Sequence, residues 1–175
     1  MGDASRVLAR LRVPLGYFCG VVAFVLASPT PRSLVAGAIV GVLGEAIRLW
    51  AAGHLEKGRE VTTSGPYMWT RHPLYLGSSV MGAGLAMAAR SPIVVVVVFF
   101  YLLITIAAAI RTEEAHLTTK FGSAYPAYRE GAAAPVRRRF SLERAIRNHE
   151  YRAAIGFLAA LALLALRAAM RARGY

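Results

Sequence analysis

Two polar stretches of this 175-residue sequence contain the residue types that a chemical reaction would need. The first, REVTTSGPYMWTRHPLYLG, covers residues 59–77 and combines arginines and a histidine with two prolines and several aromatic rings. The second, RTEEAHLTTKFGSAYPAYREG, covers residues 111–131 and begins with two adjacent glutamates. Both stretches adjoin long apolar segments, so we expect them at a membrane surface.

The prolines of the first stretch limit its backbone. Pro66 and Pro73 disfavour helix at the residues that precede them, so the backbone of residues 64–72 should be irregular, with some amides free to bind a ligand. Pro73 also suits the first turn of a helix, which places His72 at that helix's N-terminus. There the helix dipole and the open N–H groups attract an anion such as a carboxylate.

The second stretch offers the opposite charge. Glu113 and Glu114 lie where an apolar helix should leave the lipid, and they could either balance a bound cation or pair with Arg111 and Lys120. The aromatic residues that follow could pack in the interior or form the wall of a ligand site; they are Phe121, Tyr125 and Tyr128.

The elements that position these stretches are membrane helices. Hydrophobic residues make up 57% of the chain and charged residues 17%, and the mean hydropathy is +0.47, a balance typical of an integral membrane protein. A spanning helix needs about 20 apolar residues, and five segments qualify: about 11–28, 33–52, 74–90, 92–110 and 153–170. We therefore predict a single all-α domain, a polytopic membrane helical bundle. The third and fourth helices should form a tight antiparallel hairpin.

The basic residues indicate how the bundle is oriented. The net charge of +12 favours anionic lipid over nucleic acid as the counterpart, because the basic residues alternate with apolar runs. Fifteen lysines and arginines fall in the loops of one side and five in those of the other, which predicts a cytoplasmic N-terminus in a plasma membrane of the bacterial type. The last helix could instead lie along the interface. Residues 137–139, three successive arginines, should anchor the chain to anionic lipid.

This topology brings the two polar stretches to the same membrane face, where they should share a pocket. Glu45 and Arg48 lie three residues apart on the second apolar segment, and they either form a buried structural pair or line a cavity for a lipophilic substrate. A run of small residues in the third segment, residues 77–84, should allow the close approach of another helix or of a ligand.

We expect neither a metal site nor a disulfide. Cys19 is the sole cysteine, so it has no partner in the chain for a disulfide or a cysteine-based zinc site. The four histidines are not spaced like a set of metal ligands. The first apolar run shows no convincing cleavage site, so we expect it to remain as a membrane anchor.

The two polar stretches together resemble a known family. GPYMWTRHPLYLG, followed about forty residues later by EEAHLTTKFGSAYPAYREG, is similar to the two-part signature of the isoprenylcysteine carboxyl methyltransferase and phospholipid methyltransferase superfamily. The resemblance covers about residues 45–131. Sterol reductases share the Arg-His-Pro-x-Tyr-x-Gly part, whereas the second part, from Glu113 to Tyr128, favours the methyltransferases.

The resemblance implies a pocket at the cytoplasmic face that binds S-adenosylmethionine and a lipophilic acceptor. It assigns the cofactor to Val61, Thr62, Tyr67, His72, Pro73, Leu74, Tyr75, Glu113 and Glu114. His72 and Arg111 are the candidate catalytic residues, and the substrate site would include Glu45, Arg48, Arg111 and Tyr128.

Two departures from the family pattern concern the upstream stretch and the acceptor. A histidine that the isoprenylcysteine enzymes often have upstream is replaced, since the chain has Arg59-Glu60-Val61-Thr62 there. Those enzymes also hold the substrate carboxylate with an arginine, which the register places at Ala109; Arg111 is the nearest substitute.

Three functions stay open at this stage. Carboxyl methylation of an isoprenylcysteine-like acceptor is favoured over N-methylation of a phospholipid amine; the others are an NADPH-dependent membrane reductase and a non-catalytic membrane protein. A carboxylate acceptor needs no base, whereas an amine must first lose a proton, with His72 or a glutamate as the candidate proton acceptor. The segment of residues 141–170 lies beyond the signature, and its role is not predicted.

Overall fold

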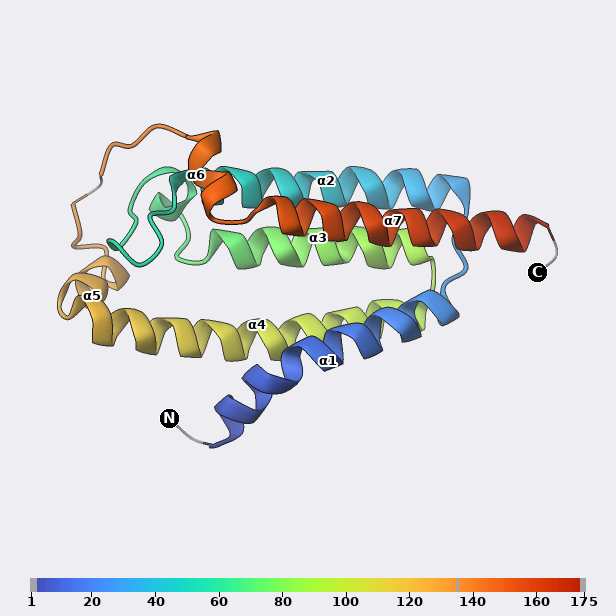
Figure 1. Ribbon diagram of the computed structural model, residues 1–175, viewed down its shortest axis with the longest axis horizontal. Helices are drawn as coiled ribbons and strands as arrows, with labels where there is room; N and C mark the ends of the chain where they lie inside the picture. Colours follow the sequence, from blue (N-terminus) through green and yellow to red (C-terminus); the bar gives the residue numbers. More distant parts are fainter. Residues whose placement is uncertain (1–2, 135, 174–175) are drawn as a thin grey trace.

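The computed structural model describes the backbone of residues 3–134 and 136–173, and side chains from residue 14 onward. The described residues form helices and contain no β-strand (Figure 1). In chain order the helices are α1 (Asp3–Leu26), α2 (Pro31–His54), the 3-10 helix η1 (Gly65–Met68), α3 (Pro73–Ala89), α4 (Pro92–Phe121), α5 (Ala124–Arg129), α6 (Leu142–Arg147) and α7 (Tyr151–Ala172). The prediction of an all-α bundle is confirmed.

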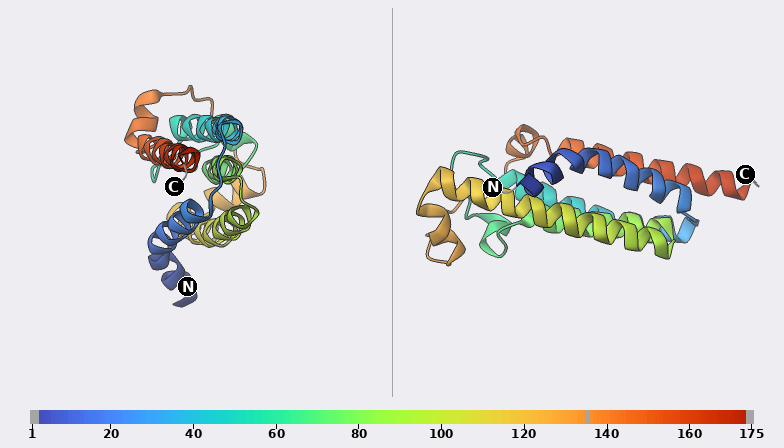
Figure 2. Two further views of the ribbon diagram at one scale, coloured as in Figure 1. Left: turned by 90° about the vertical axis from the view of Figure 1, so that its right-hand side faces the viewer. Right: turned by 90° about the horizontal axis from the view of Figure 1, so that it is seen from below.

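The predicted spans correspond to helices of two lengths. Three of the described helices, α2, α4 and α7, are long and apolar enough to cross a membrane. The other two predicted spans correspond to shorter apolar helices, Pro14–Leu26 within α1 and Pro73–Ala89. Figure 2 shows that the axes of the long helices are roughly aligned, whereas the axis of α1 is inclined to them. The last helix therefore belongs to the bundle rather than lying apart from it.

The hairpin of α3 and α4 forms as predicted but opens away from its turn. Arg90, at the C-terminus of α3, adopts a left-handed conformation (φ 50°), and α4 begins with Pro92 directly after the extended Ser91. From this turn the two antiparallel helices diverge (Figure 1). The fourth predicted span, about 92–110, lies within α4, which continues beyond it as a regular helix to Phe121.

Helix α3 packs against α2 through glycines. A Cβ atom placed on Gly84 would lie 2.5 Å from the backbone nitrogen of Gly41, and one on Gly44 would lie 2.5 Å from that of Met81. Such distances leave no room for a side chain, so the small residues of α3 serve helix packing. This close contact fixes the first turn of α3 relative to the end of α2.

The C-terminal region is attached at the end of α2. Asn148 donates its side-chain amide to the carbonyl oxygens of Ala52 and Leu55, at 2.9 Å each. Arg144 bonds the carbonyl of Gly53 at 2.5 Å, and the amide of Ser141 bonds the same carbonyl at 3.1 Å. The last carbonyls of a helix lack intrahelical partners, so these contacts cap α2 and place the start of α7 beside it.

The far end of α7 is attached to α1 in the same way. Arg167 donates to the carbonyl of Val25 at 3.1 Å and stacks over the ring of Phe24 at 5.8 Å. Arg171 approaches the carbonyl of Ala27 at 3.5 Å. These arginines, which counted against the predicted orientation, therefore cap the C-terminal end of α1.

Candidate functional site

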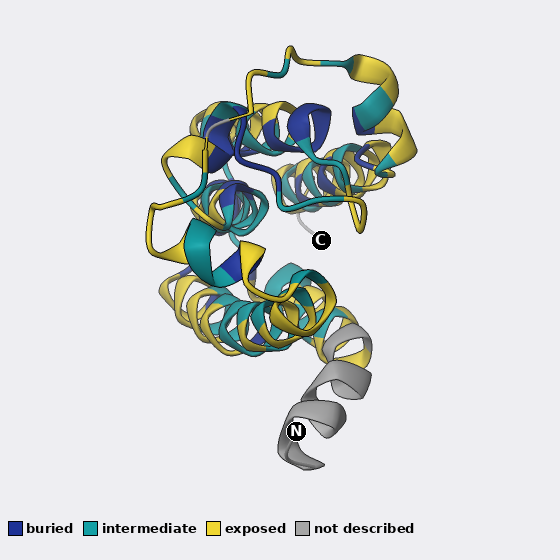
Figure 3. Ribbon diagram, turned by 90° about the vertical axis from the view of Figure 1, so that its left-hand side faces the viewer, coloured by how far each residue is buried: buried dark blue, intermediate teal, exposed yellow. Residues whose placement is uncertain are grey.

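A cavity of about 920 Å³ lies between α4 and the group formed by α2, α3 and the start of α7. It occupies the end of the bundle where α3 and α4 have diverged, opposite their turn. Figure 3 looks onto this end of the bundle. Of the residues predicted for the site, these line it: Arg48, Val61, Thr62, Tyr67, His72, Pro73, Leu74, Tyr75, Glu113 and Tyr128. The two polar stretches thus meet at one cavity. Glu45, Arg111 and Glu114 are not among its lining residues.

One face of α4 forms a long wall of the cavity. Its lining residues recur every three or four positions, as one side of a helix does; they are Thr105, Ala108, Ala109, Thr112, Glu113, His116, Leu117 and Lys120. Arg111 lies two residues from Ala109, about 200° around the helix, and is exposed. The structure therefore places Arg111 on the opposite face of α4.

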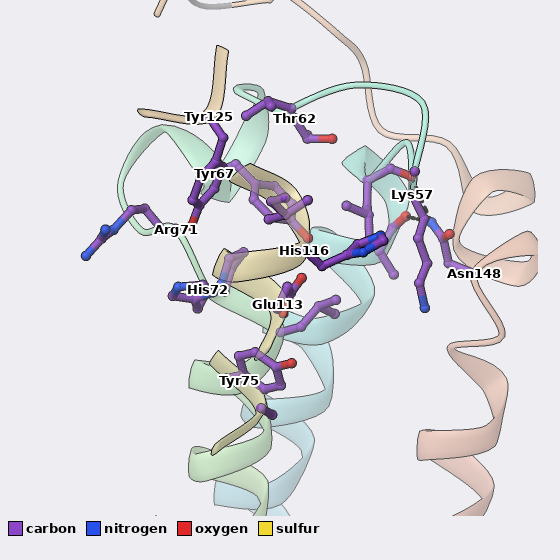
Figure 4. A pocket seen from close by; sticks show the side chains of 18 of the residues that line it. Lys57, Thr62, Tyr67, Arg71, His72, Tyr75, Glu113, His116, Tyr125 and Asn148 are labelled. Carbon is purple, nitrogen blue, oxygen red and sulfur yellow. Dashed lines mark hydrogen bonds between the residues drawn. The ribbon is translucent and has the colours of Figure 1, made fainter. Parts of the chain in front are cut away.

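The wall on the other side comes from the first polar stretch. Residues 65–68 form the short 3-10 helix, and α3 begins at Pro73 with His72 as its N-terminal cap residue, as the prolines predict. The first turn of α3 supplies Pro73, Leu74 and Tyr75 to the cavity. Figure 4 shows Tyr67, Tyr75, Glu113 and His116 gathered around this space.

The two adjacent glutamates have different surroundings. Glu114 accepts from Nε2 of His72 at 3.1 Å and lies 3.4 Å from Nη1 of Arg71, instead of pairing with Arg111 or Lys120. Glu113, one residue earlier and about 100° around the helix, lines the cavity. Glu114 thus joins α4 to the loop before α3, while Glu113 presents its carboxylate to the cavity.

Arg48 lies at the deep end of the cavity, within α2, and is held from several sides. Its Nε and Nη2 atoms donate to the two carboxylate oxygens of Glu150 at 2.6 and 3.1 Å. Its Nη1 atom donates to the hydroxyl of Ser78 and to the carbonyl of Leu74. Glu45, the partner expected from the sequence, is 3.9 Å away. The main partner of Arg48 is therefore Glu150, which also lines the cavity and which the sequence analysis missed.

Three tyrosines contribute aromatic surface and neutral hydroxyl groups. Burial raises the pKa of Tyr67 far above its usual range, and burial together with the charge of Glu114 raises the pKa of Tyr125 to about 12. Burial also raises the pKa of Tyr128, whose hydroxyl donates to the carbonyl of Tyr67 at 2.7 Å. These hydroxyls remain protonated at neutral pH, so they can donate hydrogen bonds but cannot act as bases.

Several lining residues were not predicted. Apart from Glu150, the polar ones are Lys57, Glu60, Arg71, Thr105, Thr112, His116, Lys120 and Asn148. Tyr125, for which the sequence left packing and a ligand wall open, also lines the cavity. The helical period of α4 could have identified Thr105, Thr112, His116 and Lys120. No local signal points to Asn148 or Glu150, because they reach the cavity only through the docking of α7 on α2.

Comparison with known proteins identifies the family. A family model described as phospholipid methyltransferase matches residues 15–124, more than half of the chain. The chain belongs to this family. The matched region includes α2, α3 and α4, whereas α6 and α7 lie beyond it.

The chain is also similar to one curated protein. The cobalt-zinc-cadmium resistance protein CzcN of Cupriavidus metallidurans is 33% identical over 132 residues, covering 67% of this chain. The match covers 59% of that protein, so the chain spans less than two thirds of its relative's length. No solved structure matches the chain. Among the described residues, no group of histidine, cysteine, aspartate and glutamate is arranged to hold a metal ion.

Proposed function

We propose that this protein transfers a methyl group from S-adenosylmethionine to a lipophilic acceptor in the cavity between α3 and α4. The observation that carries the proposal is the meeting of the first turn of α3 with Glu113 at one cavity, although they lie about forty residues apart in the sequence. S-adenosylmethionine supplies a methyl group on a positively charged sulfur, which is activated for displacement.

The lining residues fit this cofactor in size and in charge. A volume of about 920 Å³ lies toward the upper end of the range of about 300–1,000 Å³ that is usual for small-molecule pockets, and leaves room for a second reactant. Glu113 would hold the ammonium group, and the N-terminus of α3, where the helix dipole favours an anion, would hold the carboxylate. The faces of Tyr67 and Tyr75 suit a cationic or flat aromatic group.

The depth of the cavity suits an acceptor from the membrane. Its lining extends from Lys57 and Lys120, near the ends of α2 and α4, to Arg48 and Thr105 within those apolar helices. A lipophilic acceptor can therefore approach from the bilayer while the cofactor approaches from the aqueous side. Holding the acceptor and the methyl group in line supplies about 7–11 kcal/mol of the barrier, which is the chain's main contribution.

An isoprenylcysteine-like carboxylate is the first acceptor to test, with Arg48 in place of Arg111 as the residue that meets it. Four N–H groups of Arg48 are already engaged by Glu150, Ser78 and Leu74, and a guanidinium has five. Only one N–H group of Arg48 is thus left for a substrate carboxylate, and position 109 is an alanine. For these reasons a phospholipid amine is the second candidate. Glu113 and His116 line the cavity and could accept the proton that an amine must lose.

Two experiments test the proposal. Calorimetry on detergent-purified protein should show binding of S-adenosylmethionine and of its demethylated product, but not of NADPH; failure of both methyl-cycle compounds to bind would overturn it. Proteoliposomes given radiolabelled methyl donor with prenylcysteines or aminophospholipids then identify the acceptor. A base-labile product is an ester, whereas a methylamine survives base.

A further inference from the structure

A second, smaller depression lies where α2 ends and α7 begins. It measures about 380 Å³ and is lined by residues 55–57, Arg59 and residues 147–149. Leu55, Lys57 and Asn148 line both this depression and the larger cavity, so the two share a wall. None of the residues that carry the proposed methyl transfer lines it.

The depression carries excess positive charge. Lys57, Arg59 and Arg147 line it, and its single carboxylate, Glu56, already accepts from Nε of Arg144 at 2.8 Å. The guanidiniums of Arg59 and Arg147 approach Glu56 only to 4.0 and 3.8 Å, beyond the length of about 2.7–2.9 Å of a charge-assisted hydrogen bond. Arg147 also lies 3.7 Å from Glu143, whose side chain is 87% exposed. These three cations therefore keep hydrogen-bond donors available for an anion.

The depression lies at the level of the lipid headgroups. Residues 55–59 directly follow α2 and residues 147–149 directly precede α7, and both helices are able to cross a membrane. The neighbouring α6 exposes Leu142 and Ile146, with Phe140 just before it, while its Arg144 points back to α2. An apolar surface of this kind beside basic residues is typical of a segment that lies in the membrane interface.

We infer that this depression binds the phosphate group of an anionic membrane lipid through Lys57, Arg59 and Arg147. The positive charge of the depression favours an anionic ligand. Its position at the level of the headgroups favours a membrane lipid over a soluble ion. The bound lipid lies against the outer side of the wall formed by Leu55, Lys57 and Asn148. This inference does not depend on the proposed methyl transfer.

Native mass spectrometry of the full chain in detergent, titrated with phosphatidylglycerol or phosphatidylcholine, tests the inference. The unmodified protein should retain one phosphatidylglycerol more tightly than phosphatidylcholine. The double variant Arg59→Gln/Arg147→Gln should bind phosphatidylglycerol about 30-fold more weakly, since each basic residue near the surface contributes about fivefold. The matched control is Arg129→Gln/Arg152→Gln, which removes the same charge from two exposed arginines outside the depression.

Three results would overturn the lipid site. They are equal retention of both lipids by the unmodified protein, an equal loss in the control variant, and displacement of phosphatidylglycerol by millimolar inorganic phosphate. Binding of S-adenosylmethionine should be the same in both double variants, which shows that each is folded and separates this test from that of methyl transfer.

Discussion

Helix α3 contacts its two neighbours in opposite ways. Against α2 it packs through glycines, so that a Cβ atom on Gly84 would meet the backbone of α2. Against α4 it packs near their turn and then diverges, and a Cβ atom on Gly82 would clash only with the side-chain tip of Leu102, at 2.5 Å. One side of α3 is thus a fixed joint between backbones, and the other is open enough to hold a cavity.

The difference shows how a thin helical bundle can contain a site. Helix α4 has only two buried residues among those described, Val94 and Thr105, so most of its surface faces away from the protein (Figure 3). The α2–α3 pair provides the rigid wall, with Arg48 and the first turn of α3. Helix α4 provides the opposite wall, and Glu114 ties it to that turn through His72.

The largest expected effect is on the rigid side. Glu150→Gln removes the charge that holds Arg48 and should lower the free energy of unfolding by about 3 kcal/mol, as breaking a buried ion pair does. Thermal and denaturant unfolding in detergent would measure it, with the exposed Glu143→Gln as the control. If both variants lose the same small amount of unfolding free energy, the pairing of Arg48 with Glu150 does not stabilise the fold.

The next largest effect is expected in the cavity between α3 and α4. Glu113→Gln should weaken the binding of S-adenosylmethionine by about 10- to 100-fold, because a hydrogen bond to a charged group contributes about 1.5–3 kcal/mol. Calorimetry would measure the dissociation constant, again beside Glu143→Gln. Equal affinities would mean that Glu113 is an ordinary surface charge.

Substitutions at two glycines of α3 compare its contact with α2 and its contact with α4 directly. Gly84→Ala should cost about 1–3 kcal/mol of stability because backbone atoms of α2 cannot move aside. Gly82→Ala should cost less than about 1 kcal/mol, since Leu102 is a flexible side chain. Unfolding temperatures of the two variants in one detergent would show the difference, and the reverse order would contradict the described packing.

The attachment of α6 to α2 should depend on pH. The hydrogen bond from Arg144 lowers the pKa of Glu56, so the stabilisation is full above the usual glutamate pKa and is lost as the pH falls through the lower pKa of the folded state. Glu56→Gln should therefore cost about 1 kcal/mol at pH 7, and the difference from the unmodified protein should shrink below about pH 4. A difference that stays constant from pH 7 to pH 3 would exclude this account.

The smallest effect is expected at Arg111. Because it lies on the face of α4 away from the cavity, Arg111→Gln should change kcat/KM by less than about twofold, the size usual for a surface change. Methyl transfer in proteoliposomes would measure this ratio once an acceptor is known. A hundredfold loss of kcat/KM would mean that Arg111 contributes to the site.

Much of the fold follows from local signals in the sequence. Apolar segments of spanning length predicted the helices, and Pro73 predicted both the start of α3 and the place of His72. The common cavity followed from topology alone, because a short hairpin places the residues before α3 and the end of α4 at the same end of the bundle.

The remaining features depend on contacts between distant parts of the chain. Arg111 was chosen as the nearest substitute for the family arginine at position 109, whereas α4 continues as a regular helix through both positions and turns the Arg111 side chain away from the cavity. Glu150 pairs with Arg48 across 102 positions of sequence, and only the docking of α7 brings them together. Hydropathy and spacing carry no information on such a pairing.

The way α7 is fastened at both ends limits how far this protein can be shortened. A fragment cut to the family-matched residues 15–124 would lose the groups that cap α2, those that cap α1, and the partner of Arg48. Loss of Glu150 would leave Arg48 as an unpaired charge within an apolar helix, which is costly. The residues of the family-matched region therefore depend on α7, although α7 lies outside that region.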